Sequence, residues 1–99
     1  MFDYTGWIVQ ASAGRDKDGV FCVVGMEEEP ERLLLADGKR RRAACPKRKK
    51  RKHVLPLAGG QTEFHHPAIQ KLKRGEPVSD RELRRALAAF KEGITLGER

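Results

Sequence analysis

The segment Val20–Val24, with the sequence VFCVV, decides the fold of this chain. A strand with one face in water alternates apolar and polar residues, whereas this segment is apolar on both faces. We therefore expect a strand that is covered on both sides. Gly25 follows it directly and permits a bend or a bulge.

Further short strands are expected on either side of this segment. Trp7–Ala11 is rich in strand-forming residues, and residues 14–19 end in Asp-Gly, a strong hairpin signal. On the other side, residues 27–31 are expected to form an exposed acidic loop that leads to a third strand, Arg32–Ala36. The pattern is that of short strands joined by tight turns.

Two more strands are predicted after the third. Asp37 and Gly38 form a second hairpin-turn sequence, and Lys39–Ala44 would continue from it as a fourth strand. Pro46 would end that strand because proline has no amide hydrogen to donate to a sheet. Val54–Leu57 is expected to be a short fifth strand at an edge, so this half of the chain is typical of a small barrel or sandwich.

The second half of the chain has the periodicity of helices. Pro67 suits the first position of a short helix that Gly75 would end. Ser79 and Glu82 form a capping-box sequence for a longer helix, which Gly93 would end. The longer helix has an apolar stripe and, opposite it, a second and weaker group of basic residues: Arg81, Arg84, Arg85 and Lys91.

The net charge of the 99-residue chain is +7, and it is unevenly distributed. Residues 39–53, which we call the basic segment, contain ten basic residues and no acidic one, whereas the rest of the chain has a net charge of −3. Such a segment attracts a polyanion, with nucleic acid expected first and an anionic membrane surface second. Its basic residues are Lys39, Arg40, Arg41, Arg42, Lys47, Arg48, Lys49, Lys50, Arg51 and Lys52.

Several other classes of protein are not expected. No apolar run approaches the roughly 18 residues of a membrane-spanning helix. Asp3 stands where a secretory signal peptide carries basic residues, so we expect no secretion. Cys22 and Cys45 are too few for a disulfide framework, and we interpret both as reduced thiols of a cytoplasmic protein.

The sequence also predicts no enzyme, no cofactor and no metal site. It contains no glycine-rich phosphate loop, no serine or cysteine nucleophile beside a histidine, and no evident pair of catalytic carboxylates. The plausible metal ligands are Cys22, Cys45, His65 and His66, but no Cys-x-x-Cys pair is present and adjacent histidines rarely face one ion together.

Several pieces of sequence, taken in their order, resemble one family. They are Gly6–Val9, Ser12–Lys17, Phe21–Val24, Leu34–Lys39 and Pro46–His53. Together they resemble the bacterial KOW-domain RNA-binding proteins, which are similar to SH3-like-barrel large-subunit ribosomal proteins of archaea and eukaryotes. The resemblance covers about half of the chain.

The resemblance implies a mainly β fold with α: a small SH3-like β-barrel over residues 1–57, including the basic segment, and a helical extension over residues 58–99. The extension would contain one short and one longer helix, packed on or beside the barrel. In the family a glycine directly follows the position of Lys17, whereas Asp18 stands here. Because aspartate tolerates left-handed backbone geometry, we expect the turn to persist with an altered shape.

The resemblance also implies binding to RNA, commonly ribosomal RNA. The predicted RNA-binding positions combine the KOW loop with the basic segment: Gly14, Arg15, Lys17, Lys39, Arg40, Arg41, Arg42, Lys47, Arg48, Lys49, Lys50, Arg51, Lys52 and His53.

The mode of RNA binding is predicted from the residue types. Arginine makes bidentate contacts with phosphate and lysine supplies a looser point charge, so binding should depend strongly on salt. The basic segment holds no aromatic residue on which bases could stack, and recognition of the shape and phosphates of folded RNA is favoured. The aromatic candidates elsewhere are Tyr4, Trp7, Phe21 and Phe64, of which Trp7 and Phe21 are expected in the core.

Other interpretations of the basic segment are open. One is a solvated loop, and another is a tether on a protein-interaction module or on a transcription-elongation-linked KOW factor. A nuclear localisation sequence is a weak match, because the segment lies between predicted strands and the family that it resembles is bacterial. We expect a ribosome-associated monomer that contacts RNA and, as further partners, ribosomal proteins, with no membrane contact.

Overall fold

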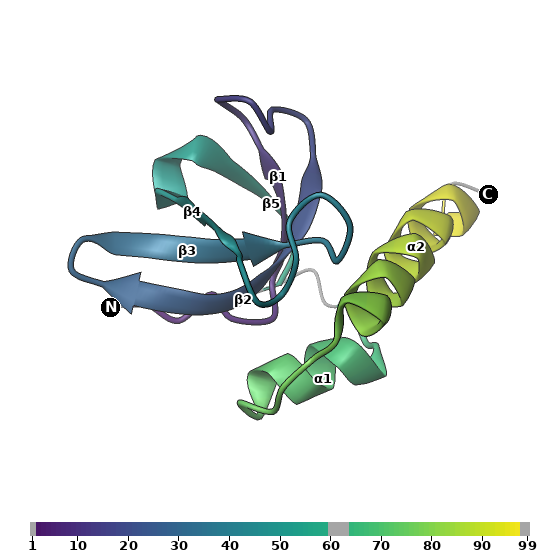
Figure 1. Ribbon diagram of the computed structural model, residues 1–99. Helices are drawn as coiled ribbons and strands as arrows, with labels where there is room; N and C mark the ends of the chain where they lie inside the picture. The colour runs from purple at the N-terminus through teal and green to yellow at the C-terminus, as the bar shows by residue number, and fades with distance from the viewer. Residues whose placement is uncertain (1, 60–63, 98–99) are drawn as a thin grey trace.

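The computed structural model describes residues 2–59 and 64–97, and it contains one antiparallel sheet and two helices (Figure 1). The sheet has five strands in the order β4-β3-β2-β1-β5, so β4 and β5 form its two edges. The mainly β class with added helices is therefore confirmed. The elements are β1 (Ile8–Ala11), β2 (Val20–Glu28), β3 (Glu31–Ala36), β4 (Lys47–Lys49), a 3-10 turn (Arg51–His53), β5 (Val54–Ala58), α1 (Pro67–Lys73) and α2 (Asp80–Gly97).

The central strand β2 is buried on both faces, as its apolar sequence predicts. Phe21 and Val23 are fully buried in one cluster, which they share with Leu33 and Leu35 of β3. Cys22 points to the opposite face and is also fully buried. At Gly25 the pairing of β2 with β3 shifts in register, which is the irregularity expected there.

The two helices cover one face of the sheet. Cys22 and Ala36 from the sheet share a core with Ile69 of α1 and with Leu83 and Leu87 of α2. Figure 1 shows both helices on one side of the strands. None of the helices in the described part of the chain is long and apolar enough to cross a membrane.

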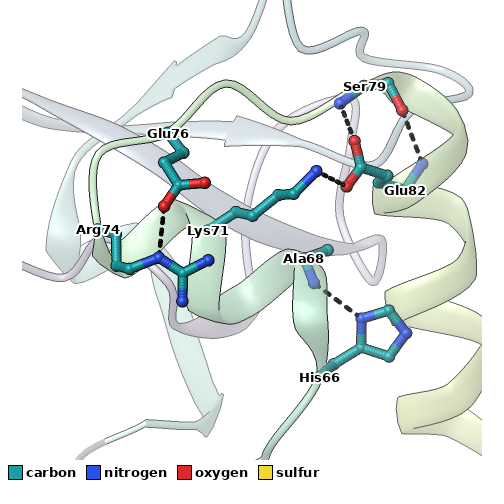
Figure 2. A network of polar contacts seen from close by, with 7 residues as sticks. All are labelled: His66, Ala68, Lys71, Arg74, Glu76, Ser79 and Glu82. Atoms are coloured by element: carbon teal, nitrogen blue, oxygen red, sulfur yellow. Dashed lines mark hydrogen bonds and ion pairs between the residues drawn. The ribbon is translucent and has the colours of Figure 1, made fainter.

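Local hydrogen bonds fix where the helices begin and end. Ser79 Oγ accepts a hydrogen bond from the amide of Glu82, and Glu82 Oε1 accepts one from the amide of Ser79, each at 3.1 Å (Figure 2). Lys71 Nζ of α1 donates to Glu82 Oε2 at 2.8 Å, which joins the two helices and lowers the pKa of Glu82. The predicted capping box is therefore formed. Gly75 ends α1 in the left-handed conformation, as predicted.

The predicted fourth strand over Lys39–Ala44 is wrong. Residues 37–46 form a loop, and Pro46 precedes the short strand β4 instead of ending a strand. The reason is local: Asp37 Oδ1 accepts hydrogen bonds from the amides of Lys39 and Arg41, both at 2.9 Å, and the carbonyl of Arg41 accepts two more. These backbone groups are satisfied within the loop and do not need a neighbouring strand.

Two further boundaries differ from expectation. Glu27, Glu28 and Glu31 extend β2 and β3, with Glu28 opposite Glu31, so the predicted acidic loop is reduced to a turn at Glu29 and Pro30. The helix α2 continues through Gly93 to Gly97. A glycine inside a helix costs only about 1 kcal/mol relative to alanine, so it does not by itself end one.

Candidate nucleic-acid interface

The KOW-like loop, residues 12–19, is attached to the basic segment at three points. The amide of Ser12 donates to the carbonyl of His53 at 2.9 Å, and Lys49 Nζ donates to the carbonyl of Ala13 at 2.6 Å. Arg41 Nη2 forms an ion pair with Asp16 Oδ2 at 2.8 Å. The fold thus brings the two parts of the predicted RNA-binding site into contact with each other.

Asp16 belongs to this contact although the sequence did not single it out. Its side chain is buried, and the Arg41 guanidinium holds the pKa of its carboxyl below the usual range, with Arg40 and Lys47 adding to the effect. Asp16 therefore fixes the loop against the basic segment. The one signal in the sequence is that an acid stands between two basic residues, Arg15 and Lys17, while the basic segment contains no acid with which its own cations could pair.

The loop presents its basic residues outward. Gly14, Arg15 and Lys17 are exposed. Asp18 has a φ of +73° and so takes the left-handed conformation that aspartate tolerates.

Four of the ten basic residues in the basic segment have partners inside the protein, and we call them the anchored cations. Arg41 and Arg48 pair with acids that lie elsewhere in the sequence, Asp16 and Glu27. The Arg48–Glu27 pair is exposed and therefore weak, and Arg48 stays open to a stronger anion. Lys49 is buried, with 8% of its surface exposed, and Arg51 Nη1 donates to the carbonyl of Val54 at 3.2 Å.

The side chains of the other six basic residues of the segment make no hydrogen bond or ion pair within the described residues, and we call these residues the open cations. Five of them are exposed and Lys47 is half-buried. Because they are not neutralised by a direct partner, they dominate the positive potential of this surface. The open cations are Lys39, Arg40, Arg42, Lys47, Lys50 and Lys52.

The helix α2 holds the part of the basic segment that lies in the loop between β3 and β4. Asp80 Oδ1 accepts a hydrogen bond from the amide of Ala43 at 2.7 Å, and Arg84 Nη1 donates to the carbonyl of Gly38 at 2.6 Å. The loop projects towards α2 in Figure 1. The helix therefore positions residues that the sequence analysis assigned to the sheet half of the chain.

A hollow of about 630 Å³ lies where the loop meets α2. It is lined by Gly38, Lys39, Arg42, Asp80 and Arg84. Arg84 thus joins two of the open cations around one depression, although the sequence analysis treated the basic face of the helix as separate. The spacing of basic residues in α2 could not reveal this, because the contact spans 46 positions in the sequence.

Gly38 allows the loop to approach α2 closely. Its φ is +78°, and a Cβ atom at this position would lie 2.1 Å from the carbonyl oxygen of Asp80. Glycine is the residue that satisfies both conditions, a left-handed backbone and direct contact with another backbone.

Two of the aromatic candidates from the sequence pack in the core or against it. Phe21 is fully buried, and Phe64 packs edge-to-face on Phe90 with ring centroids 5.3 Å apart. Trp7 is half-buried against the cluster that contains Phe21. Packing is therefore the first role of these three side chains, and stacking on a base would be a second one.

The cysteines and the possible metal ligands are the remaining candidates from the sequence. Within the described residues, no three histidine, cysteine or acidic side chains gather in a way that could hold a metal ion. Cys22 and Cys45 are both free thiols. Burial raises the pKa of the Cys22 thiol to about 12, so Cys22 behaves as a small apolar side chain.

No protein-family model matches this sequence, and a comparison with curated proteins gives no significant match. The interpretation of the surface therefore rests on its own geometry and charge.

Proposed function

We propose that this chain binds structured RNA, with ribosomal RNA as the first candidate, as a ribosome-associated module of the KOW type. One observation carries the proposal: the KOW-like loop and the basic segment contact each other at three points, and together they hold the six open cations and the exposed Arg15 and Lys17. The phosphates of a folded RNA are the chemical match to such a surface.

The distribution of charge also supports a polyanionic partner. Outside the basic segment the chain has a net charge of −3, so the positive charge is not needed to keep the whole domain in solution. The two acids that form ion pairs with the basic segment, Asp16 and Glu27, pair with Arg41 and Arg48 and position them. The open cations remain to neutralise phosphate.

The fold is compatible with the SH3-like barrel that the resemblance implies. The five antiparallel strands lie in a nearly sequential order. β2 is the longest of them, and the irregular pairing at its Gly25 is the kind of feature that bends a small sheet. We propose the barrel as the fold type because these features match it.

We also propose that the protein is a cytoplasmic monomer.

The test is binding to total ribosomal RNA at several salt concentrations. Replacing Lys47, Lys50 and Lys52 with glutamine should weaken binding and lower the slope of log affinity against log salt by roughly 2 to 3, because about one counterion is released for each phosphate contact. A control variant that removes the same charge from the helices, Lys73→Gln with Arg81→Gln and Arg85→Gln, should bind nearly as the wild type does. If the variant at Lys47, Lys50 and Lys52 binds with the same affinity and the same salt slope as the wild type, these lysines do not contact the RNA.

A protein-interaction module is the second candidate function, and one feature favours it. A hollow of about 630 Å³ between the sheet and the helical part is lined mainly by apolar groups, among them Val24, Leu34, Pro46, Leu72 and Val78. Co-sedimentation with ribosomes at low salt separates the two functions. A protein that stays in the light fractions and binds one acidic protein instead would favour the second.

A further inference from the structure

Three aromatic side chains near the beginning of the chain form a cluster, which we call the aromatic platform: Phe2, Tyr4 and Trp7. The ring centroids of Phe2 and Tyr4 are 4.6 Å apart, those of Tyr4 and Trp7 are 4.8 Å apart, and those of Phe2 and Trp7 are 5.6 Å apart. Each ring therefore touches both others. Phe2 is not among the aromatic candidates from the sequence, because an isolated phenylalanine has no periodic pattern around it.

The platform is built on a firm base. The amide of Trp7 donates to the carbonyl of Tyr4 at 3.0 Å, which closes a turn between them. Gly59 lies directly under the indole, and a Cβ atom there would be 2.4 Å from the ring of Trp7. The carboxylate of Asp3 accepts a hydrogen bond from the amide of Thr5 at 2.9 Å. Tyr4 and Trp7 are thus fixed, and Phe2 rests on both.

Phe2 is nevertheless open to solvent. Its exposed fraction is 58%, and over residues 2–59 and 64–93 the only other large apolar side chain with comparable exposure is Leu55, at 53%. A phenyl ring that packs on one side and is open on the other offers apolar surface to a flat ligand.

The platform adjoins the basic segment. The guanidinium of Arg51 lies over the ring of Tyr4, 5.2 Å from its centroid. Lys50 and Lys52, on either side of Arg51 in the chain, are exposed open cations. An aromatic surface beside free positive charge matches a nucleotide, whose base has a π-face and whose phosphate is an anion.

We propose that the aromatic platform is a stacking site for an unpaired RNA base, with Phe2 in contact with the base and with Lys50 and Lys52 neutralising the adjoining phosphates. This proposal rests on the proposed function and makes it more specific. The preferred RNA has an unpaired base next to a folded region, instead of a continuous duplex. In a continuous duplex every base is stacked inside the helix and none can reach Phe2.

The test compares two RNAs with equal numbers of phosphates: a hairpin with an unpaired loop and a fully paired duplex. Trp7 is the only tryptophan of the chain, so its fluorescence reports on the platform directly. The wild type should bind the hairpin more tightly than the duplex, with quenching of Trp7 on hairpin binding alone.

The variant that tests the stacking contact is Phe2→Leu, which keeps an apolar side chain but removes the aromatic face. It should bind the hairpin roughly tenfold more weakly, the loss expected for one stacked base, and bind the duplex as the wild type does. Leu55→Ala is the matched control, because it removes the other exposed large apolar side chain, and it should leave both affinities unchanged.

The possible results separate the two proposals. If the wild type binds both RNAs equally, or if Phe2→Leu lowers both affinities by the same factor, the stacking site is refuted while phosphate binding stands. If the wild type binds neither RNA, the proposed function itself fails.

Discussion

The basic segment consists of two parts that have similar composition but are held in different ways. Residues 39–46, the loop part, are fixed by α2 through the Ala43–Asp80 hydrogen bond and through the bond between Arg84 and the adjacent Gly38. Residues 47–53, the strand part, are fixed by the sheet: β4 pairs with β3, and Lys49 is tied to the KOW-like loop. The two parts of the basic segment are thus held mainly by different elements, α2 and the sheet.

This difference assigns a role to the helices. They share a core with one face of the sheet, and in addition they carry Asp80 and Arg84, which set the position of the loop part. A change at the contact with α2 should therefore affect Lys39, Arg40 and Arg42, and leave the cations of the strand part in place.

The largest expected effect comes from Gly38→Ala, which breaks the support of the loop part. The new methyl group would collide with the backbone of Asp80 and would force a left-handed conformation on alanine. We expect the free energy of unfolding to fall by about 3 kcal/mol or more. Urea denaturation followed by circular dichroism measures this change.

Gly75→Ala is the matched control. Gly75 has a similar φ, +76°, but no atom lies within 4 Å of the position of its Cβ. Alanine should therefore cost only the conformational energy there, about 1 kcal/mol. The difference between the two variants isolates the contact with α2, and equal losses would show that the close approach of Gly38 to Asp80 contributes nothing.

The sequence predicts the frame of this fold better than it predicts the surface. The β-rich and apolar segments at Trp7–Ala11, Val20–Val24 and Arg32–Ala36 lead to the first three strands, and the capping box at Ser79 marks the first residues of α2. These features arise from local periodicity and local hydrogen bonds, which can be inferred from adjacent residues.

The arrangement of the basic segment could not be predicted in the same way. Its charges show that a polyanion is the expected partner, but the division into anchored and open cations depends on Asp16, Glu27 and the carbonyl of Ala13, which are distant in sequence. The interpretation of Lys39–Ala44 as a strand failed because the Asp37 carboxylate satisfies the loop's amides locally. Contacts between distant residues decide these points.

A smaller effect is expected in the strand part, where Lys49 and Lys50 are neighbours with different roles. Lys49→Met removes the buried hydrogen bond to the carbonyl of Ala13 and should lower the free energy of unfolding by about 2 kcal/mol. Lys50→Met changes an exposed side chain and should alter stability by less than about 0.5 kcal/mol.

RNA affinity gives the second readout for this pair. Lys50→Met removes an open cation and should reduce the salt slope by roughly 1 in the ribosomal-RNA assay. If Lys49→Met instead leaves the protein as stable as the wild type, Lys49 is not an anchor, and the distinction between anchored and open cations is wrong at this position.

The smallest effect concerns Asp16, which links the KOW-like loop to the loop part. Because Arg41 lowers the pKa of its carboxyl, this ion pair stabilises the fold at pH values above the ordinary aspartate pKa of about 4, and the stabilisation is lost as the pH falls through the lowered value. Asp16→Asn should therefore be less stable than the wild type by about 1 kcal/mol at pH 7, with the difference vanishing in strong acid. Urea denaturation at a series of pH values measures this difference, in which the other carboxylates cancel. Asp18→Asn removes the same charge from the same loop without breaking a side-chain hydrogen bond, so a pH-dependent difference of equal size in that variant would assign the effect to net charge instead of to the Asp16–Arg41 pair.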